Sequence, residues 1–365
     1  MVSWKGWLCG AISLTTSLYS QYIPPAPSEE IPLEQRIPRL ERAHEAKETF
    51  ITPRMADVYT YGAFLYWQPY IPNFVFATTS TTISNVSNGV GNLSNNTQFD
   101  VVSFGYKPGV RVGIGKIFVF DYWSLNLEWT RLHAKGYTSQ AAASTNVTLF
   151  EVWSQTDSKL TVQTIKAVPQ IEYDMVEMDL IRSIWFSKYF ALGLILGVEG
   201  IALNESVQID AFSAPSADNA NHFTHLKNDF LGAGSSIGID ANFYVGKGFS
   251  VFGFGKTALY VGRISSEVND LYTVSLGGAE LAKLHRKNRT PTIQSSYQTN
   301  AGLEWKGDVN EDKVNLAIWA AFEMNFFQTQ VKLRQFVNLP SSSLLFNQVG
   351  DVGLEGFNLG AKLTF

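Results

Sequence analysis

The sequence predicts an all-β fold: a transmembrane antiparallel up-and-down β-barrel of about ten strands, within a range of about eight to twelve. Three observations favour it. Only 16% of the 365 residues are charged while 13% are aromatic. The most apolar run, residues 189–198, is too short for a helix to cross a bilayer. Segments that alternate apolar and polar residues recur along the chain and end it.

The C-terminal segment, residues 357–365, is the clearest of these strands. Its apolar side chains share one face, and the chain ends on an aromatic residue. A closed barrel in lipid has no free edge, whereas an apolar edge strand in water aggregates. The alternative is the last strand of a soluble sandwich or barrel. We expect four residues to act as an assembly signal for the barrel-assembly machinery: Phe357, Leu359, Leu363 and Phe365.

Ten segments qualify as membrane strands, an even number as in single-chain bacterial barrels. The facing of the seventh is open, because Phe252 and Phe254 share a face with Lys256. The ten segments are 58–67, 107–115, 123–130, 174–181, 189–199, 231–243, 249–260, 297–305, 316–326 and 357–365.

The connectors alternate in length, which predicts short periplasmic turns and long extracellular loops, with both termini periplasmic. The long polar connectors are expected at 77–100, 135–170, 204–228, 263–295 and 328–350. Aromatic residues near strand ends predict girdles at the membrane interfaces. These are Trp67, Trp123, Trp185, Phe186, Tyr189 and Trp305.

The N-terminus predicts an export signal over residues 1–20, followed by a charged periplasmic arm over 21–56 and the barrel over 57–365. A buried amphipathic start is the alternative to the signal. The only cysteine, Cys9, lies inside the predicted signal, which excludes disulfide chemistry in the mature chain. The formal net charge of -4 does not favour a nucleic-acid partner.

Strand parity predicts a polar inner face with an excess of acids. One interpretation is a water-filled, mildly cation-preferring pore. The other is a lumen filled by its own side chains and ion pairs, such as Arg111 with a neighbouring acid, since charges must face inward in any membrane barrel. The predicted inward residues are Arg111, Asn126, Glu128, Glu177, Asp179, Asp240, Asn242, Glu304, Glu323 and Lys362.

Three weaker features lie outside the lumen. A basic cluster on an expected external loop could bind lipopolysaccharide phosphate or an acidic host glycan, or be an ordinary solvated loop; its residues are Lys283, Arg286, Lys287 and Arg289. His222 and His225 resemble a metal site only loosely, since free loops do not preorganise ligands. His133 with Ser139 lacks a supporting catalytic motif. We therefore expect no enzyme activity, no metal and no cofactor.

Several segments together resemble the Legionella-type major outer membrane protein family of pore-forming barrels, which also occurs in chlamydia-like bacteria. They are VYTYGAFLYW at 58–67, YKPGVRVGIG at 106–115, WSLNLEWTRLH at 123–133, NDFLGAG at 228–234 and GKGFS at 246–250. The resemblance implies a surface-exposed porin of the bacterial outer membrane.

With parity, this predicts passive diffusion of small hydrophilic solutes through the lumen. Outer-membrane lipid, lipopolysaccharide and the assembly machinery are the expected partners, and a homo-oligomer is left open. The alternative function is a structural or adhesive surface barrel with a closed lumen, which binds host or lipopolysaccharide groups through its external loops.

Overall fold

The computed structural model describes residues 58–72, 74–87, 90–118, 123–142, 147–153, 161–213, 220–274, 280–309, 314–339 and 342–365. All of them belong to one compact unit, Pro53–Phe365. The predicted export signal and charged arm lie outside the described residues. In these described ranges, no helix has the length and apolar character needed to cross a membrane.

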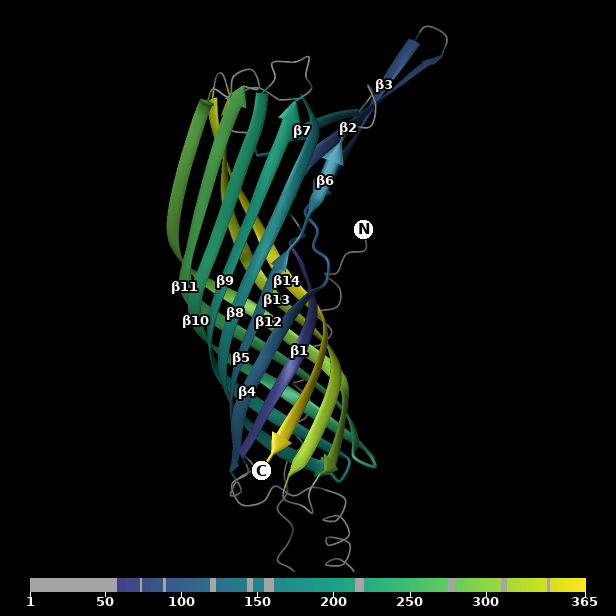
Figure 1. Ribbon diagram of the computed structural model, residues 1–365, viewed down its shortest axis with the longest axis vertical. Coiled ribbons are helices and arrows are strands. Elements are labelled where there is room, and N and C mark those ends of the chain that lie inside the picture. Colours follow the sequence, from purple (N-terminus) through teal and green to yellow (C-terminus); the bar gives the residue numbers. More distant parts are fainter. Residues whose placement is uncertain are drawn as a thin grey trace, which may run out of the picture. The chain divides into compact units, whose positions relative to one another are not determined.

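The described residues contain fourteen strands, and ten of them close into a ring. The ring runs β8, β5, β4, β1, β14, β13, β12, β11, β10, β9 and back to β8, every pair antiparallel (Figure 1). The ring strands are β1 (Val58–Tyr70), β4 (Lys107–Phe118), β5 (Trp123–Lys135), β8 (Thr161–Ser187), β9 (Phe190–Ser213), β10 (Ala220–Gly246), β11 (Phe249–Val274), β12 (Glu280–Asp308), β13 (Asn315–Leu339) and β14 (Ser342–Thr364). This ring confirms the predicted barrel and its number of strands.

Four further strands extend the sheet beside β8. They are β2 (Val75–Ser87), β3 (Val90–Val101), β6 (Thr138–Ala141) and β7 (Val147–Glu151). Both β6 and β7 pair with β8, while β2 joins β7 to β3. They lie in the connections between β1 and β4 and between β5 and β8.

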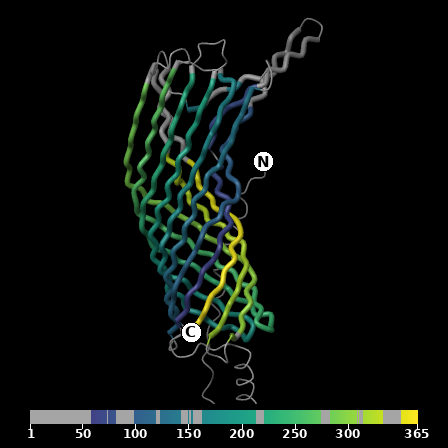
Figure 2. The backbone as a smooth tube through the Cα atoms, in the orientation of Figure 1, coloured from purple at the N-terminus to yellow at the C-terminus, as the bar shows by residue number. Residues whose placement is uncertain are grey.

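The last strand of the chain closes the ring against the first. Figure 2 shows β14 beside β1, and their register runs from Tyr59 opposite Thr364 to Tyr70 opposite Gly353. Val58 and Phe365 exchange two backbone hydrogen bonds, of 3.3 and 2.9 Å. The second closure pairs β8 with β9. Each ring strand therefore has a partner on both sides, as lipid requires of a β-structure.

The outer face of the ring carries an apolar band. On β11 the outward residues from Phe249 to Val261 are apolar, small or, once, Thr257, and Arg263 is the next outward residue. Those residues span about 30 Å for a strand rising about 3.3 Å per residue and tilted by roughly 40°. That is the thickness of the hydrocarbon core.

The band ends at a common level on the side of the barrel remote from Phe365, and we call this level the distal boundary. It is marked by the first charged or amide side chain that faces outward beyond the band. These residues are Gln68, Arg131, Asp174, Asn204, Asp229, Arg263, Arg289, Gln328 and Glu355. We call the barrel beyond this boundary the distal half, and the end that holds Phe365 the proximal end.

The distal half has the opposite polarity from the band. Strands β8 to β12 are 24 to 29 residues long, far more than the 9–11 residues needed to cross a bilayer. Beyond the boundary their outward residues are largely polar, while the inward ones build a hydrophobic core. It includes Ile165, Ile171, Leu203, Val207, Ile209, Leu226, Phe230, Ile264 and Val268.

Two sequence predictions are corrected here. The expected long loops at 135–170, 204–228, 263–295 and 328–350 are largely strand, and 77–100 contains β2 and β3. The reason is that these strands leave lipid and continue with a polar outer face. Trp67 was expected in an interfacial girdle, but it is fully buried inside the barrel. Trp185, Phe186 and Tyr189 are exposed at the proximal turn, as a girdle requires.

Deleting Phe365 tests the closure between β1 and β14. The deletion removes two backbone hydrogen bonds, each worth about 1 kcal/mol, together with an outward aromatic side chain. We expect the free energy of unfolding to fall by about 2 kcal/mol, and the fraction of heat-modifiable, assembled barrel to fall with it. Phe365→Trp is the matched control and should assemble normally. Normal assembly and stability of the deletion variant would contradict the role of this residue.

Candidate functional site

The inner face at the level of the apolar band holds all ten residues that parity predicted. Arg111, Asn126, Glu128, Glu177, Asp179 and Glu323 lie toward the distal boundary, while Asp240, Asn242, Glu304 and Lys362 lie toward the proximal end. Their contacts identify what the lumen contains.

Arg111 of β4 is held by two acids from different strands. Its two terminal nitrogens each lie 2.8 Å from a carboxylate oxygen of Glu323 on β13, and its Nε lies 2.8 Å from Glu128 Oε1 on β5. Glu323 is fully buried. Because β1 and β14 separate β4 from β13 in the ring, this bidentate ion pair reaches across part of the lumen.

Lys256 of β11 is the second buried cation. Its Nζ lies 2.6 Å from Glu177 Oε1, 2.8 Å from Glu199 Oε1 and 3.5 Å from Asp179 Oδ2. Strand parity placed Glu177 and Asp179 on the inner face, but it left the facing of Lys256 open and did not include Glu199. The signal was present in the odd positions of β9: Glu199 shares its parity with Ala191 and Ile195, which are buried.

The two groups adjoin, because Glu128 and Glu177 are direct cross-strand partners of β5 and β8. We call the set the central charge cluster. It contains Arg111, Glu128, Glu177, Asp179, Glu199, Lys256 and Glu323. Five carboxylates thus surround two cations. Neutral side chains complete it, since Tyr61 and Tyr260 donate to Glu128 and Glu199, and Asn358 donates to Glu323 at 2.8 Å.

Two glycines of β4 make room for the tyrosines of this cluster. The rings of Tyr61 and Tyr59 lie directly over Gly113 and Gly115, where any added Cβ would overlap them. Their hydroxyls thereby reach β5, where Tyr59 donates to Asn126 at 3.3 Å and Tyr61 contacts Glu128. Small residues on one strand therefore position the polar groups of its neighbour.

Three aromatic side chains cover the distal side of the central charge cluster, and we call them the aromatic layer: Trp67, Tyr173 and Phe327. The ring centroids of Tyr173 lie 6.3 Å from Trp67 and 5.8 Å from Phe327. In the ring of ten, β8 and β13 are five strands apart, so Tyr173 and Phe327 come from opposite walls. Arg111 Cζ lies 5.5 Å from the Trp67 ring and links layer and cluster. Side chains therefore meet across the whole lumen at this level.

The proximal residues form smaller, separate contacts. Asn242 donates to Asp240 at 2.9 Å, and Lys306 Nζ lies 2.7 Å from Glu304. Lys362 Nζ lies 5.1 Å from the centroid of the Tyr59 ring. These groups line the inner wall on the proximal side of the central charge cluster. The contacts named here stay within one strand or join neighbouring strands, so they do not cross the lumen.

The predicted basic loop is part of a strand. Lys283, Arg286, Lys287 and Arg289 all belong to β12. By alternation, three of them face outward and Arg286 faces inward, so the four do not form one anion site. Lys287 lies 3.2 Å from Glu267 on β11. The loop prediction is wrong because β11 and β12 stay paired well beyond the membrane.

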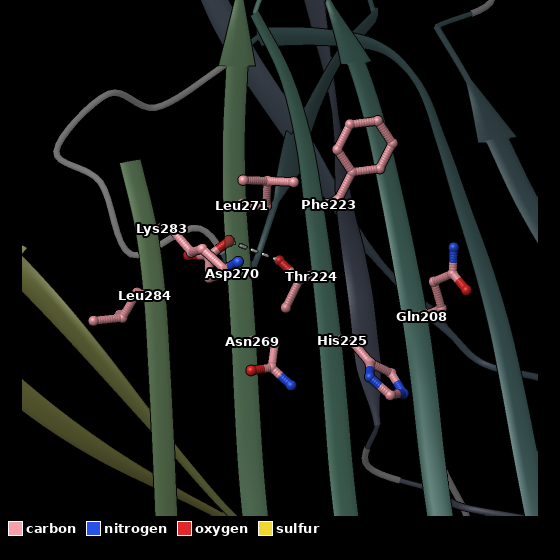
Figure 3. Close-up of a pocket in the computed structure, with 9 residues that line it drawn as sticks. All are labelled: Gln208, Phe223, Thr224, His225, Asn269, Asp270, Leu271, Lys283 and Leu284. Carbon is pink, nitrogen blue, oxygen red and sulfur yellow. Dashed lines mark hydrogen bonds between the residues drawn. The ribbon is translucent and has the colours of Figure 1, made fainter. Parts of the chain in front are cut away.

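The two histidines of the loosely predicted metal site, His222 and His225, face opposite sides of the barrel wall. His222 faces inward against Asp270 and Thr224, whereas His225 faces outward. Within the described ranges, no group of three His, Cys, Asp or Glu residues could hold a metal ion. His133 of β5 lies 3.3 Å from Glu172. A pocket of about 380 Å³ lies in the distal half of β9 to β12. Figure 3 draws the residues that line it, among them Gln208, Phe223, His225, Asn269, Leu271 and Lys283.

Lys256→Met tests whether the central charge cluster holds the barrel together. The substitution keeps the volume but leaves three buried carboxylates without their cation, which costs about 3–5 kcal/mol. We expect that loss of unfolding free energy in denaturant titrations of the refolded barrel. Lys227→Met is the control, because its ion pair with Asp229 at 2.9 Å is half exposed and is worth less than about 1 kcal/mol. Equal losses in the two variants would contradict a structural role of the cluster.

Comparison with known proteins finds solved structures of low similarity and one family match. The outer-membrane protease OmpT of Escherichia coli is 12% identical, with a TM-score of 0.44; the match covers 85% of this chain and 96% of OmpT. A FadL homologue of Pseudomonas aeruginosa is 8% identical with a TM-score of 0.28, over 86% of this chain and 90% of its own. The chain matches no curated protein sequence. The family described as Legionella pneumophila major outer membrane protein precursor matches residues 52–365, and the chain is therefore a member of this family of bacterial outer-membrane barrels.

Proposed function

We propose that this protein is a closed-lumen outer-membrane barrel, whose distal half serves as a contact surface on the outside of the cell. The carrying observation is the contact between opposite walls. Tyr173 and Phe327 touch across the lumen, and the ion pairs of Arg111 and Lys256 fill the level below them. A hydrophilic solute meets this barrier within the membrane.

The energetics of opening support the closed state. A path through the central charge cluster requires that Arg111 or Lys256 leave its carboxylates. Separating a buried pair without new partners costs about 3–5 kcal/mol. The hydrophobic core of the distal half adds a second barrier, because polar solutes would have to displace packed apolar side chains.

The orientation is proposed from the lengths of the turns and strands. Short turns on the proximal side and long, polar-faced strands on the distal side favour a periplasmic proximal end and an extracellular distal half. The pocket in Figure 3 then faces the medium, where its amide, imidazole and aromatic side chains are available to surface partners. A structural or adhesive role uses this surface and needs no open lumen.

A pore for small hydrophilic solutes is the second candidate. It is favoured by the polar inner face at the membrane level, with five carboxylates around two cations in the central charge cluster. It requires that the aromatic layer and the ion pairs move aside. Charge-neutralising variants at Glu128 and Glu177 would then lower the cation preference.

Planar-bilayer conductance separates the two candidates. We expect refolded wild-type barrel to give no stable channel steps. The variant Tyr173→Ala with Phe327→Ala opens the aromatic layer but keeps the ion pairs of Arg111 and Lys256, so it should give only brief steps of low conductance. The control is Phe64→Ala with Tyr66→Ala, which removes a stacked aromatic pair from the outer wall. Stable, cation-preferring channels in the wild type that weaken in Glu177→Gln would favour the pore and refute the closed lumen.

Cysteine labelling on intact cells tests the orientation. The chain has one cysteine, Cys9, so single introduced cysteines can be followed in a Cys9→Ser background. We expect a membrane-impermeant maleimide to label His225→Cys on the distal outer wall several times faster than Lys247→Cys in the proximal turn. Permeabilised cells should label both. Preferential labelling of Lys247→Cys on intact cells would reverse the orientation.

A further inference from the structure

Charged residues at the distal boundary differ in their partners. Arg131 lies 3.8 Å from Asp174, its direct cross-strand neighbour, and Asp229 lies 2.9 Å from Lys227. Arg263 and Arg289 make no ion pair with any of the residues that the structure describes. Among the described residues, these two exposed arginines are therefore left without an ion-pair partner.

The register brings these two arginines close. Arg263 of β11 is opposite Pro291, and Arg289 of β12 is opposite Ser265. The arginines are therefore diagonal neighbours on the outer face, with backbones about 7–8 Å apart. Arginine side chains are long enough for two guanidinium groups at this spacing to reach one ligand between them.

An apolar surface lies beside the pair and on its proximal side. Leu231 is opposite Arg263 on β10, and Val261 is opposite Ile293. Leu231, Val261 and Ile293 are 69%, 70% and 72% exposed, the highest values among the large apolar side chains described as exposed. The site thus combines a broad acyl-chain surface with two cations at the level where lipid head groups begin.

We propose that Arg263 and Arg289 bind a phosphate group of the phosphorylated glycolipid in the outer leaflet, lipopolysaccharide, whose acyl chains pack on Leu231, Val261 and Ile293. The planar guanidinium pairs with phosphate through two hydrogen bonds, which Lys does less well. The nearby acids already have cations of their own, since Glu267 is paired with Lys287 at 3.2 Å and Asp229 with Lys227 at 2.9 Å. The inference uses the proposed orientation but is independent of whether the lumen is closed.

The test is lipid binding to the purified full-length barrel in detergent, measured by native mass spectrometry. The probes are diphosphoryl lipid A, its dephosphorylated form and inorganic phosphate. We expect Arg263→Gln with Arg289→Gln to weaken diphosphoryl lipid A binding about ten- to a hundredfold, since charge-assisted hydrogen bonds are lost. Arg263→Lys with Arg289→Lys should lose less. Arg131→Gln, at the same level but on the opposite wall and already paired, should change binding less than about twofold.

The controls fix the source of the phosphate. Wild-type barrel should prefer the diphosphoryl over the dephosphorylated lipid, and inorganic phosphate should not displace the lipid at equal concentration. Unchanged binding in the double glutamine variant, an equal loss in Arg131→Gln, or full displacement by inorganic phosphate would each overturn the proposal. Heat-modifiable mobility of every variant confirms that the barrel is assembled, which these surface substitutions leave intact.

Discussion

Closure of the sheet is the constraint on which the rest of this structure depends. In lipid every backbone N–H and C=O needs a partner within the protein, and the pairings of β1 with β14 and of β8 with β9 provide the last of them. Closure also fixes the facing of every residue. A slip of one residue in β13 would turn Glu323 toward lipid and Phe322 into the lumen. The register, the apolar band and the buried charges are therefore set together.

The same strands serve two environments. Within the membrane β11 presents Val251 and Leu259 outward and Lys256 inward, whereas beyond the distal boundary it presents Glu267 outward and Val268 inward. Alternation persists while its polarity reverses. The distal half thereby has the packing of a water-soluble barrel, and its core stabilises the long strands that leave the bilayer. The outer face changes from apolar to polar at the distal boundary, where lipid head groups begin.

The sequence predicted the ten ring strands and the inward residues of the membrane level, because a period of two is a local signal. It failed where that signal weakens. In β11 the inner face carries Phe252 and Phe254 beside Lys256, so hydrophobicity could not identify the side. In the distal half the apolar residues face inward and the outer face is polar. The sequence criterion for a membrane strand was an apolar outer face, so these segments were predicted to be loops.

The contacts within the lumen could not be predicted from the sequence for a different reason. Arg111 and Glu323 are 212 residues apart, and their pairing depends on the order of strands around the ring and on its stagger. Parity places both residues inside but does not say which walls they connect. The tyrosine rings over Gly113 and Gly115 likewise require the register of β1 against β4.

A polar inner face is therefore weak evidence for a pore in a barrel of this size. About eight strands leave an interior that side chains just fill, and ten strands add little space when tyrosines and tryptophans occupy it. Charges inside such a barrel need counter-charges from the chain itself, as Arg111 and Lys256 have. What separates a filled lumen from an open one is the partner of each charge: water and ions in an open pore, buried carboxylates here. If the lumen is closed, as proposed, the central charge cluster is a packing element, and transport through it would have to begin by breaking its ion pairs.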